Sequence, residues 1–277
     1  CLIHHKYPPG FIPRDALGKY AVAGGEQFDW TGDHIHTNMI ALYTSLRSAG
    51  YFVDVLSEPF TCFNAEAYGA LLIVDSEDEF TLQEIEKLHT DVSELGLGLV
   101  VAADWYDLDL MDTLRFFDDN TRLWWTPATG GSNIPALNDL LQPFKIAFGG
   151  ESYEGRVPLA IPDYFEFMTG NAIVQFPEQG RLIASDLVGI HSNRVSKVAI
   201  LGATKTTSGN GRIVVMGDSS CLDTAQKQEP SCLHLFLHAV NFAVGYTNIT
   251  ESFPSSLPAF KVPLPAADPL PIRPQTG

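Results

Sequence analysis

The chain has 277 residues, of which 45% are hydrophobic, and its 33 acidic and 17 basic residues give a formal net charge of -16. This length is enough to bury a sizeable core, as one large domain or two small ones, and the excess of carboxylates predicts no nucleic-acid partner because it leaves no basic face for phosphates. No apolar run approaches the roughly 18–20 residues that cross a bilayer, so we expect no membrane span within the chain.

The first elements are a predicted helix and strand behind an irregular N-terminal segment. Residues 1–28 are rich in Pro and Gly and form this segment; an α/β domain over 29–250 and a Pro-rich linker or tail over 251–277 follow. Apolar side chains at positions 39, 42, 43 and 46 follow helical spacing, and Gly50 stands where that helix would end. The stretch YFVDVL then predicts a short strand.

Two continuous apolar runs predict buried parallel strands that end in carboxylates. They are GALLIVDS, which ends near Asp75, and LGLGLVVAAD, which ends in Asp104. Between them, Thr81 and Glu84 form a T-x-x-E capping box, which opens a helix with apolar residues at 82, 85, 88 and 92. This alternation of helices and strands predicts an α/β sheet with parallel strands.

The second half of the chain gives weaker signals. The segment 105–135 is aromatic and predicts a loop, Asn133 predicts the cap of a short helix over IPALNDLLQPF, and residues 144–209 predict short strands and turns. GRIVVMGDSS predicts another buried strand, and a helix follows that ends at Gly245. We therefore predict a mostly parallel sheet flanked by helices, Rossmann- or flavodoxin-like or glutamine-amidotransferase-like.

The block DWTGDHIHTN, just before the first helix, could bind a metal. Its Asp33, His34 and His36 carry metal-ligand side chains, but a catalytic zinc needs at least three protein ligands that converge. Further candidates are distant in sequence: Asp75, Asp104, Asp218 and His191. Alternatively, Asp33 or Thr37 caps the helix while the histidines pack in the loop. We assign no metal ligand and predict no cofactor.

Nucleophile motifs are incomplete. Asp218 and Ser219 in GDSS resemble the G-D-S block of a lipase-like hydrolase family, but no D-x-x-H follows. His234 and His238 have the spacing of H-E-x-x-H, but residue 235 is Leu235 instead of the required Glu. The turn AADWYD lacks the cysteine of glutamine amidotransferases. The candidate pocket residues to inspect are therefore Asp33, His34, His36, Asp75, Asp104, Asp218 and Ser219.

The cysteines and one sequon bear on the compartment. Cys221 and Cys232 lie eleven residues apart and could form a disulfide in an oxidising compartment, or remain two separate buried thiols. Asn248 starts an N-x-T sequon and is a possible glycosylation site. The start on Cys1 instead of Met is typical of a processed piece or a fragment.

The aromatic segment supplies a candidate interface. Interfaces concentrate Trp and Phe where charge is excluded, so we expect these side chains to contact a neighbouring domain. They could instead belong to the core or line a carbohydrate- or peptide-binding groove. The residues are Trp105, Phe116, Phe117, Trp124 and Trp125.

Several blocks, in order, resemble one family. They are YPPGFIPRD, DWTGDHIHTN, LRSAGYFVDVL, PFTCF, LLIVDSEDEF, DNTRLWWTPATGGSNIPALNDLL and GRIVVMGDSSCLD. Together, from about Tyr7 to Gly245, they resemble the region after the catalytic domain in the site-1 protease family of the subtilisin superfamily, the membrane-bound transcription factor proteases.

This resemblance implies a membrane-anchored serine endopeptidase of the secretory pathway, which cuts membrane-bound transcription factor precursors in the ER and Golgi lumen. Its Asp-His-Ser triad cannot be carried over, because no D-[ST]-G, H-G-T or G-T-S block is present. We therefore expect a non-catalytic luminal accessory domain whose partner is its own upstream protease domain, with a protein substrate or adaptor as a further possibility. The alternatives are a free-standing hydrolase or metal enzyme built on Asp33, His34, His36 and Asp218, or a carbohydrate- or peptide-binding module.

Overall fold

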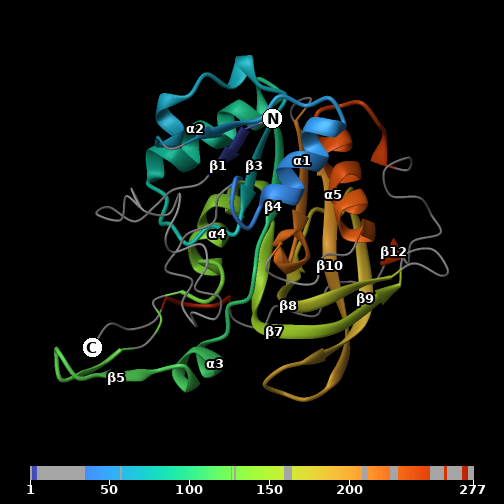
Figure 1. Cartoon of the computed structure of the whole chain (residues 1–277). Helices are drawn as coiled ribbons and strands as arrows, with labels where there is room; N and C mark the ends of the chain where they lie inside the picture. The colour runs from blue at the N-terminus through green and yellow to red at the C-terminus, as the bar shows by residue number, and fades with distance from the viewer. Residues whose placement is uncertain are drawn as a thin grey trace.

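A computed structural model describes most of the chain (Figure 1). The described residues are 2–4, 35–56, 58–125, 127, 129–158, 164–207, 211–224, 230–249, 259–260 and 270–273. The α-helices are α1 (Ile40–Ser48), α2 (Leu82–Ser93), α3 (Leu108–Thr113), α4 (Ile134–Leu141) and α5 (Pro230–Ala243). Short 3₁₀ helices are η1 (Phe60–Cys62), η2 (Ala65–Ala67), η3 (Gln142–Phe144) and η4 (Ser220–Leu222). The strands are β1 (Leu2–His4), β2 (Asp54–Leu56), β3 (Ala70–Val74), β4 (Gly98–Ala102), β5 (Phe116–Asp118), β6 (Leu123–Trp125), β7 (Ala147–Pro158), β8 (Tyr164–Gln175), β9 (Arg181–Gly189), β10 (Val195–Lys205), β11 (Arg212–Met216) and β12 (Ala259–Phe260).

One ten-stranded sheet has two halves of different kind. Its order is β12-β9-β7-β8-β10-β11-β4-β3-β1-β2. The strands from β11 to β2 pair in parallel, whereas every pairing from β12 to β11 is antiparallel. Strand β11 joins the two halves, because it lies parallel to β4 and antiparallel to β10.

The antiparallel half closes on itself. Strand β9 pairs with both β7 and β10, while β8 also lies between β7 and β10, so these four strands form a small barrel. The predicted mostly parallel sheet, Rossmann- or flavodoxin-like or glutamine-amidotransferase-like, is therefore wrong. The segment predicted as short strands and turns instead forms strands of 12, 12, 9 and 11 residues. Their glycines and register shifts interrupt the alternation by which strands of this length are normally detected.

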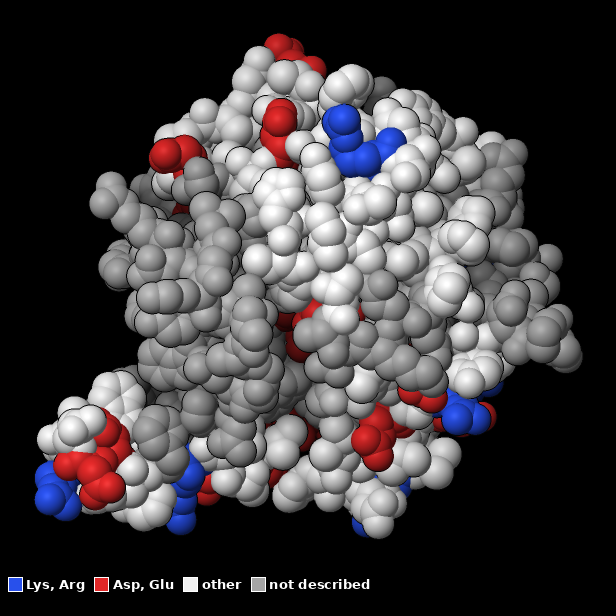
Figure 2. Space-filling model, viewed as in Figure 1, with Lys and Arg blue, Asp and Glu red and all other residues white. Residues whose placement is uncertain are grey.

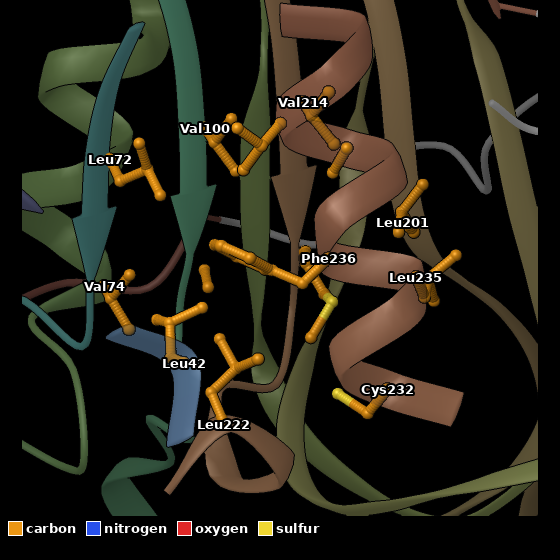
Figure 3. Close-up of a cluster of buried hydrophobic side chains, with 14 of the residues drawn as sticks. Leu42, Leu72, Val74, Val100, Leu201, Val214, Leu222, Cys232, Leu235 and Phe236 are labelled. Atoms are coloured by element: carbon orange, nitrogen blue, oxygen red, sulfur yellow. The ribbon is translucent and has the colours of Figure 1, made fainter. Parts of the chain in front are cut away.

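Helices cover both faces of the parallel half (Figure 1). Strand residues alternate between these faces, as the period of two requires. On one face, Leu72, Val100 and Val214 pack in a cluster with Phe236 of α5 and Leu42 of α1 (Figure 3). On the other, the cluster contains residues of β3, β4 and β11 together with Leu88 of α2 and Leu137, Leu140 and Leu141 of α4.

Capping residues mark where α2 and α4 begin. Thr81 and Glu84 form the predicted capping box of α2, and Asn133 accepts a hydrogen bond from the Ala136 N–H at the start of α4. The apolar face of α2 was predicted less well: Leu82 is 74% exposed and Glu84 is buried. The Glu84 carboxylate accepts from the Phe60 N–H and so joins α2 to η1. None of the helices in the described part of the chain is long and apolar enough to cross a membrane.

The predicted loop over 105–135 contains regular structure. Helix α3 begins after Asp107, whose carboxylate accepts from the N–H groups of Asp109 and Leu110. Strands β5 and β6 then form a separate two-stranded antiparallel sheet. This hairpin extends away from the body of the protein (Figure 1).

Candidate functional site

The carboxylates at the strand ends come together because of the sheet order. Strands β11, β4 and β3 are adjacent and parallel, so their carboxyl ends lie at the same edge of the sheet. Asp75 follows β3, Asp104 closely follows β4, and Asp218 and Ser219 follow β11. Figure 2 shows acidic side chains within a hollow near the middle of the face in view.

Two serines connect these carboxylates. The Ser132 hydroxyl donates to Asp75 Oδ1 at 3.1 Å and accepts from the Asp104 backbone N–H at 2.8 Å. The Ser220 N–H donates to Asp218 Oδ1 at 2.9 Å, and the Ser220 hydroxyl lies 3.5 Å from Asp104 Oδ1. We call Asp75, Ser132, Asp104, Ser220 and Asp218 the strand-end row. Its bonds join the loop before α4 and the turn after β11 to the edge of the sheet.

Asp218 is the most perturbed carboxyl group of the row. It is fully buried, and this burial raises its pKa from 3.8 to about 6. Hydrogen bonds from Ser220 and from the Met168 N–H, at 2.6 Å from Asp218 Oδ2, oppose this effect because they stabilise the anion. Asp218 therefore ties β8 of the barrel to the end of β11.

Two glycines allow the loop before α4 to approach the row. A Cβ atom on Gly131 would lie 2.3 Å from Asp104 Oδ2, and one on Gly130 would lie 2.2 Å from the Trp105 backbone oxygen. A side chain at position 130 would therefore require movement of the backbone, and one at position 131 would displace the Asp104 side chain. Sequence reasoning missed Ser132 and Ser220. The available signal was the GGSN turn directly before the Asn133 cap.

Asp33 and His34 of the candidate pocket lie outside the described residues. The His36 side chain is exposed, and its ring contacts the ring edge of Tyr43, with centroids 5.3 Å apart. Just beyond, the Thr224 N–H donates to the Asn38 backbone oxygen at 2.7 Å. Asn38, two residues before α1, therefore lies against the segment that follows β11.

The described residues form neither a metal site nor an activated nucleophilic serine. Within the described ranges, no three His, Cys, Asp or Glu side chains are grouped so that they could hold a metal ion. The Ser219 hydroxyl is buried and has no hydrogen-bond partner in the described part of the chain, so no described base activates it. His191 is exposed and lies 3.5 Å from Asp109, while His234 and His238 are exposed on α5.

A second polar cluster lies beside the row and was not predicted. The Asn171 side chain accepts from the Tyr106 N–H at 2.7 Å and donates to the backbone oxygens of Tyr106 and Gly149, both at 2.8 Å. The Tyr106 hydroxyl donates to the Ile272 oxygen at 2.7 Å, and burial raises the pKa of this phenol to about 12. Asn171 thus connects the barrel to the chain after β4, and Tyr106 connects that chain to the C-terminal region.

An ion-paired arginine holds the same C-terminal stretch. Arg273 contacts both carboxylate oxygens of Glu79, at 2.8 and 2.6 Å, and Asp139 at 2.7 Å. The hydrogen bond from Arg273 lowers the pKa of Glu79, and its pairing with both carboxylates raises the pKa of the guanidinium. Residues 270–273 are therefore fixed against α4 and the loop before α2.

The predicted aromatic interface divides into two places. Trp105 is partly buried and packs against the core, whereas Trp124 and Trp125 of β6 are 65% and 48% exposed. Phe117 of β5 is also exposed and meets Trp124 edge to face, with ring centroids 5.6 Å apart. The side chain of Phe116 lies outside the described residues. We call Phe117, Leu123, Trp124 and Trp125 the aromatic hairpin.

Cys221, Cys232 and the sequon at Asn248 lie between the end of β11 and the residues just after α5. Cys221 and Cys232 are joined by a disulfide, with Cα atoms 6.1 Å apart, which ties η4 to α5. Asn248 is exposed a few residues beyond the end of α5.

Comparison with known proteins identifies similar sequences along most of the chain. Residues 2–256 match the family described as "MBTPS1, fourth GATase-like domain". The chain is 44% identical over 247 residues to subtilisin-like protease SBT6.1 of Arabidopsis thaliana, covering 86% of this chain and 23% of that protein. It is 46% identical over 232 residues to membrane-bound transcription factor site-1 protease of Homo sapiens, covering 81% of this chain and 22% of that protein. The chain thus spans less than a quarter of these relatives.

A solved structure shares the fold. The chain resembles the N-terminal domain of mmIFT52 with a TM-score of 0.54, 14% sequence identity, and coverage of 90% of this chain and 98% of that one. At this identity, the similarity concerns the fold alone.

Proposed function

The chain belongs to the family of the fourth GATase-like domain of MBTPS1, and from that premise we propose that it is a non-catalytic accessory domain of a subtilisin-like serine endopeptidase. The observation that carries the proposal is the aromatic hairpin. We infer that the hairpin packs against the protease domain of the same polypeptide, where it stabilises the protease or helps to position a protein substrate or adaptor.

The bonding of the strand-end row supports a structural role for it. Ser132 and Ser220 hold the carboxylates of Asp75, Asp104 and Asp218, and these bonds fasten loops to strand ends. A nucleophilic serine requires a neighbouring base, and none of the described residues bonds to the Ser219 hydroxyl. We therefore assign proteolysis to the part of the relatives that this chain does not span.

The exposure of the hairpin supports an interface. Phe117 and Trp124 are paired on one face of a two-stranded sheet that extends from the body of the protein (Figure 1), and Leu123 and Trp125 lie on its other face, so both faces expose apolar side chains. Large apolar side chains exposed close together typically mark a protein–protein contact, and Trp is enriched among the residues that dominate binding energy. A neighbouring domain of the same chain is always present at high effective concentration, so even a contact of modest intrinsic affinity would persist.

The compartment follows from the same proposal. A disulfide between Cys221 and Cys232 persists in an oxidising environment such as the ER lumen, and exposed Asn248 can accept a glycan there. We propose a location in the ER and Golgi lumen, within a membrane-anchored parent protein that processes membrane-bound transcription factor precursors.

The test uses the complete protease that contains this chain. Trp124→Ala combined with Trp125→Ala should weaken contact with the protease domain at least tenfold, because truncating central aromatic residues commonly costs ~2 kcal/mol or more. We expect reduced secretion of the protease or reduced cleavage of a membrane-bound transcription factor precursor. Phe52→Ala is the matched control, since Phe52 is 81% exposed but lies before β2.

Hydrogen exchange of the complete protease, with and without the double substitution, provides the direct measurement of contact. The hairpin should lose protection in the variant while the strands of the sheet keep theirs. Unchanged exchange, secretion and cleavage in the double variant would refute the assignment of the hairpin as an interface.

A further inference from the structure

A pocket lies at the edge of the sheet opposite the strand-end row. It has a volume of about 510 Å³ and is formed by α2, η3 and the residue after it, the β8–β9 turn, and the end of β10 with Thr206 and Thr207 beyond it. Ile213, at the start of β11, lies in its wall, whereas Asp218 follows the other end of that strand. The pocket is therefore separate from the strand-end row. Its volume is in the range of natural ligand sites.

The charged side chains of the pocket sum to a positive charge, opposite in sign to the chain as a whole. Lys145, Lys205 and His89 line it, with Glu178 as the single carboxylate among its lining residues. The complete chain carries a net charge of -16. A cationic pocket on such a strongly anionic protein attracts an anionic group. The rest of the surface repels that group, so it should bind at the pocket in preference to other places on the protein.

Both lysines are available for a ligand. Neither Lys145 nor Lys205 has an ion-pair or hydrogen-bond partner for its ammonium group in the described part of the chain, and both side chains are exposed. Other basic side chains form ion pairs within the chain, as in Lys87–Asp91 and Arg156–Glu166. An anionic ligand could therefore bind both lysines without displacing an existing carboxylate.

The backbone at Lys145 also points to a role for its side chain. Lys145 has φ 60° and ψ 40° at the end of η3, in the left-handed region. Glycine or asparagine is preferred there, and an ordinary residue costs roughly 1 kcal/mol. The position thus holds a lysine where glycine would be less strained.

Part of the pocket lining is apolar. It includes Phe144, Phe176 and Ile213. The Phe176 ring is held between two glycines: a Cβ atom on Gly180 would lie 2.3 Å from its Cε1, and one on Gly202 would lie 2.5 Å from its Cε2. Because both glycines lack a side chain, the ring has room to occupy its present position in the pocket lining.

We propose that this pocket binds an acidic peptide segment. Carboxylates of the peptide would pair with Lys145 and Lys205, and one aromatic or aliphatic side chain would enter above Phe176. A peptide fits better than a small metabolite because the charged groups stand on the exposed rim, whereas small-molecule sites enclose most of their ligand. This inference does not depend on the proposed contact of the aromatic hairpin.

The probe is a fluorescein-labelled peptide of sequence Glu-Asp-Phe-Asp-Glu, titrated with the whole 277-residue chain and followed by fluorescence anisotropy. We expect saturable binding at 50 mM salt that weakens several-fold at 300 mM, because charged rim contacts are screened. The peptide Gln-Asn-Phe-Asn-Gln tests the role of charge, and Glu-Asp-Gly-Asp-Glu tests the role of the apolar side chain. Each should bind at least tenfold more weakly.

Variants separate the pocket from general charge. Lys145→Ala with Lys205→Ala should weaken binding at least tenfold, whereas Lys197→Ala, an exposed lysine on β10 outside the pocket, should change it less than twofold. Gly180→Ala should also weaken binding of the Phe peptide by displacing the Phe176 ring. Unchanged circular dichroism and thermal midpoints confirm that each variant is folded.

Three outcomes would overturn the proposal. They are no binding of the acidic peptide at 1 mM chain, equal binding of the neutral peptide, and binding that the double lysine substitution leaves intact. Full displacement of the peptide by millimolar inorganic phosphate, together with equal affinity for the peptide that lacks Phe, would assign the pocket to small anions instead.

Discussion

The buried carboxyl group of Asp218 gives a pH-dependent prediction of the stability of the fold. Its pKa is raised from 3.8 to about 6 by burial, so the folded chain binds the proton more tightly than the unfolded chain. This contribution to stability is fully present below pH 3.8 and is lost as the pH rises to about 6. A difference of about two pKa units corresponds to a loss of about 3 kcal/mol, after which the contribution stays constant.

Asp218→Asn should remove this dependence. The asparagine oxygen can accept from either the Met168 or the Ser220 N–H, but its amide group then faces the other donor. The substitution therefore costs about 1–3 kcal/mol at all pH values. Superimposed on that cost, the stability advantage of the parent over the variant should shrink by about 2.5 kcal/mol between pH 4 and pH 7, because part of the total is already lost at pH 4.

Urea unfolding at half-unit pH steps measures both free energies of unfolding. Asp112→Asn serves as the control, because Asp112 is exposed on α3 and its loss should leave the pH profile nearly unchanged. A parent-to-variant difference that stays constant from pH 4 to pH 7 would show that Asp218 is ionised throughout. The argument from burial would then be wrong.

Two further substitutions test the connections around the sheet. Glu84→Ala removes the acceptor for the Thr81 and Phe60 N–H groups, so it should lower the free energy of unfolding in urea by about 2–3 kcal/mol. Glu84→Gln should lower it less, because glutamine can complete a capping box. Equal losses for the two variants would contradict this account. Replacing Cys221 and Cys232 together by alanine opens a loop of 11 residues and should cost about 3 kcal/mol, measured by denaturation without reductant; an unchanged midpoint would contradict it.

The elements that could be predicted from the sequence depend on local chemistry. Buried strands such as β3 are short apolar runs, and caps such as Thr81 or Asn133 bond to N–H groups only two or three residues away. The barrel could not be predicted in the same way. Its strands include Gly149, Gly155 and Gly202, and their pairing partners are set by closure of β9 onto both β7 and β10.

The residues of the candidate site were likewise predictable only where they follow regular elements. Asp75, Asp104 and Asp218 follow recognisable strands, so their shared edge follows once those strands are adjacent and parallel. The partners Ser132 and Ser220 come from irregular turns, where spacing carries no periodic signal. The pocket with Lys145 and Lys205 was missed because four separate segments bring its lining together.

The position of β11 has a kinetic consequence. It is the only described strand that joins the parallel half to the barrel, and its partners in β4 lie more than a hundred residues earlier in the chain. During synthesis, β4 must therefore wait with an open edge until the barrel strands have been made. Such long-range pairing slows folding and leaves an edge available for mispairing. We expect nascent chains that end before residue 212 to depend strongly on chaperones, and folding to be completed only when β11 inserts.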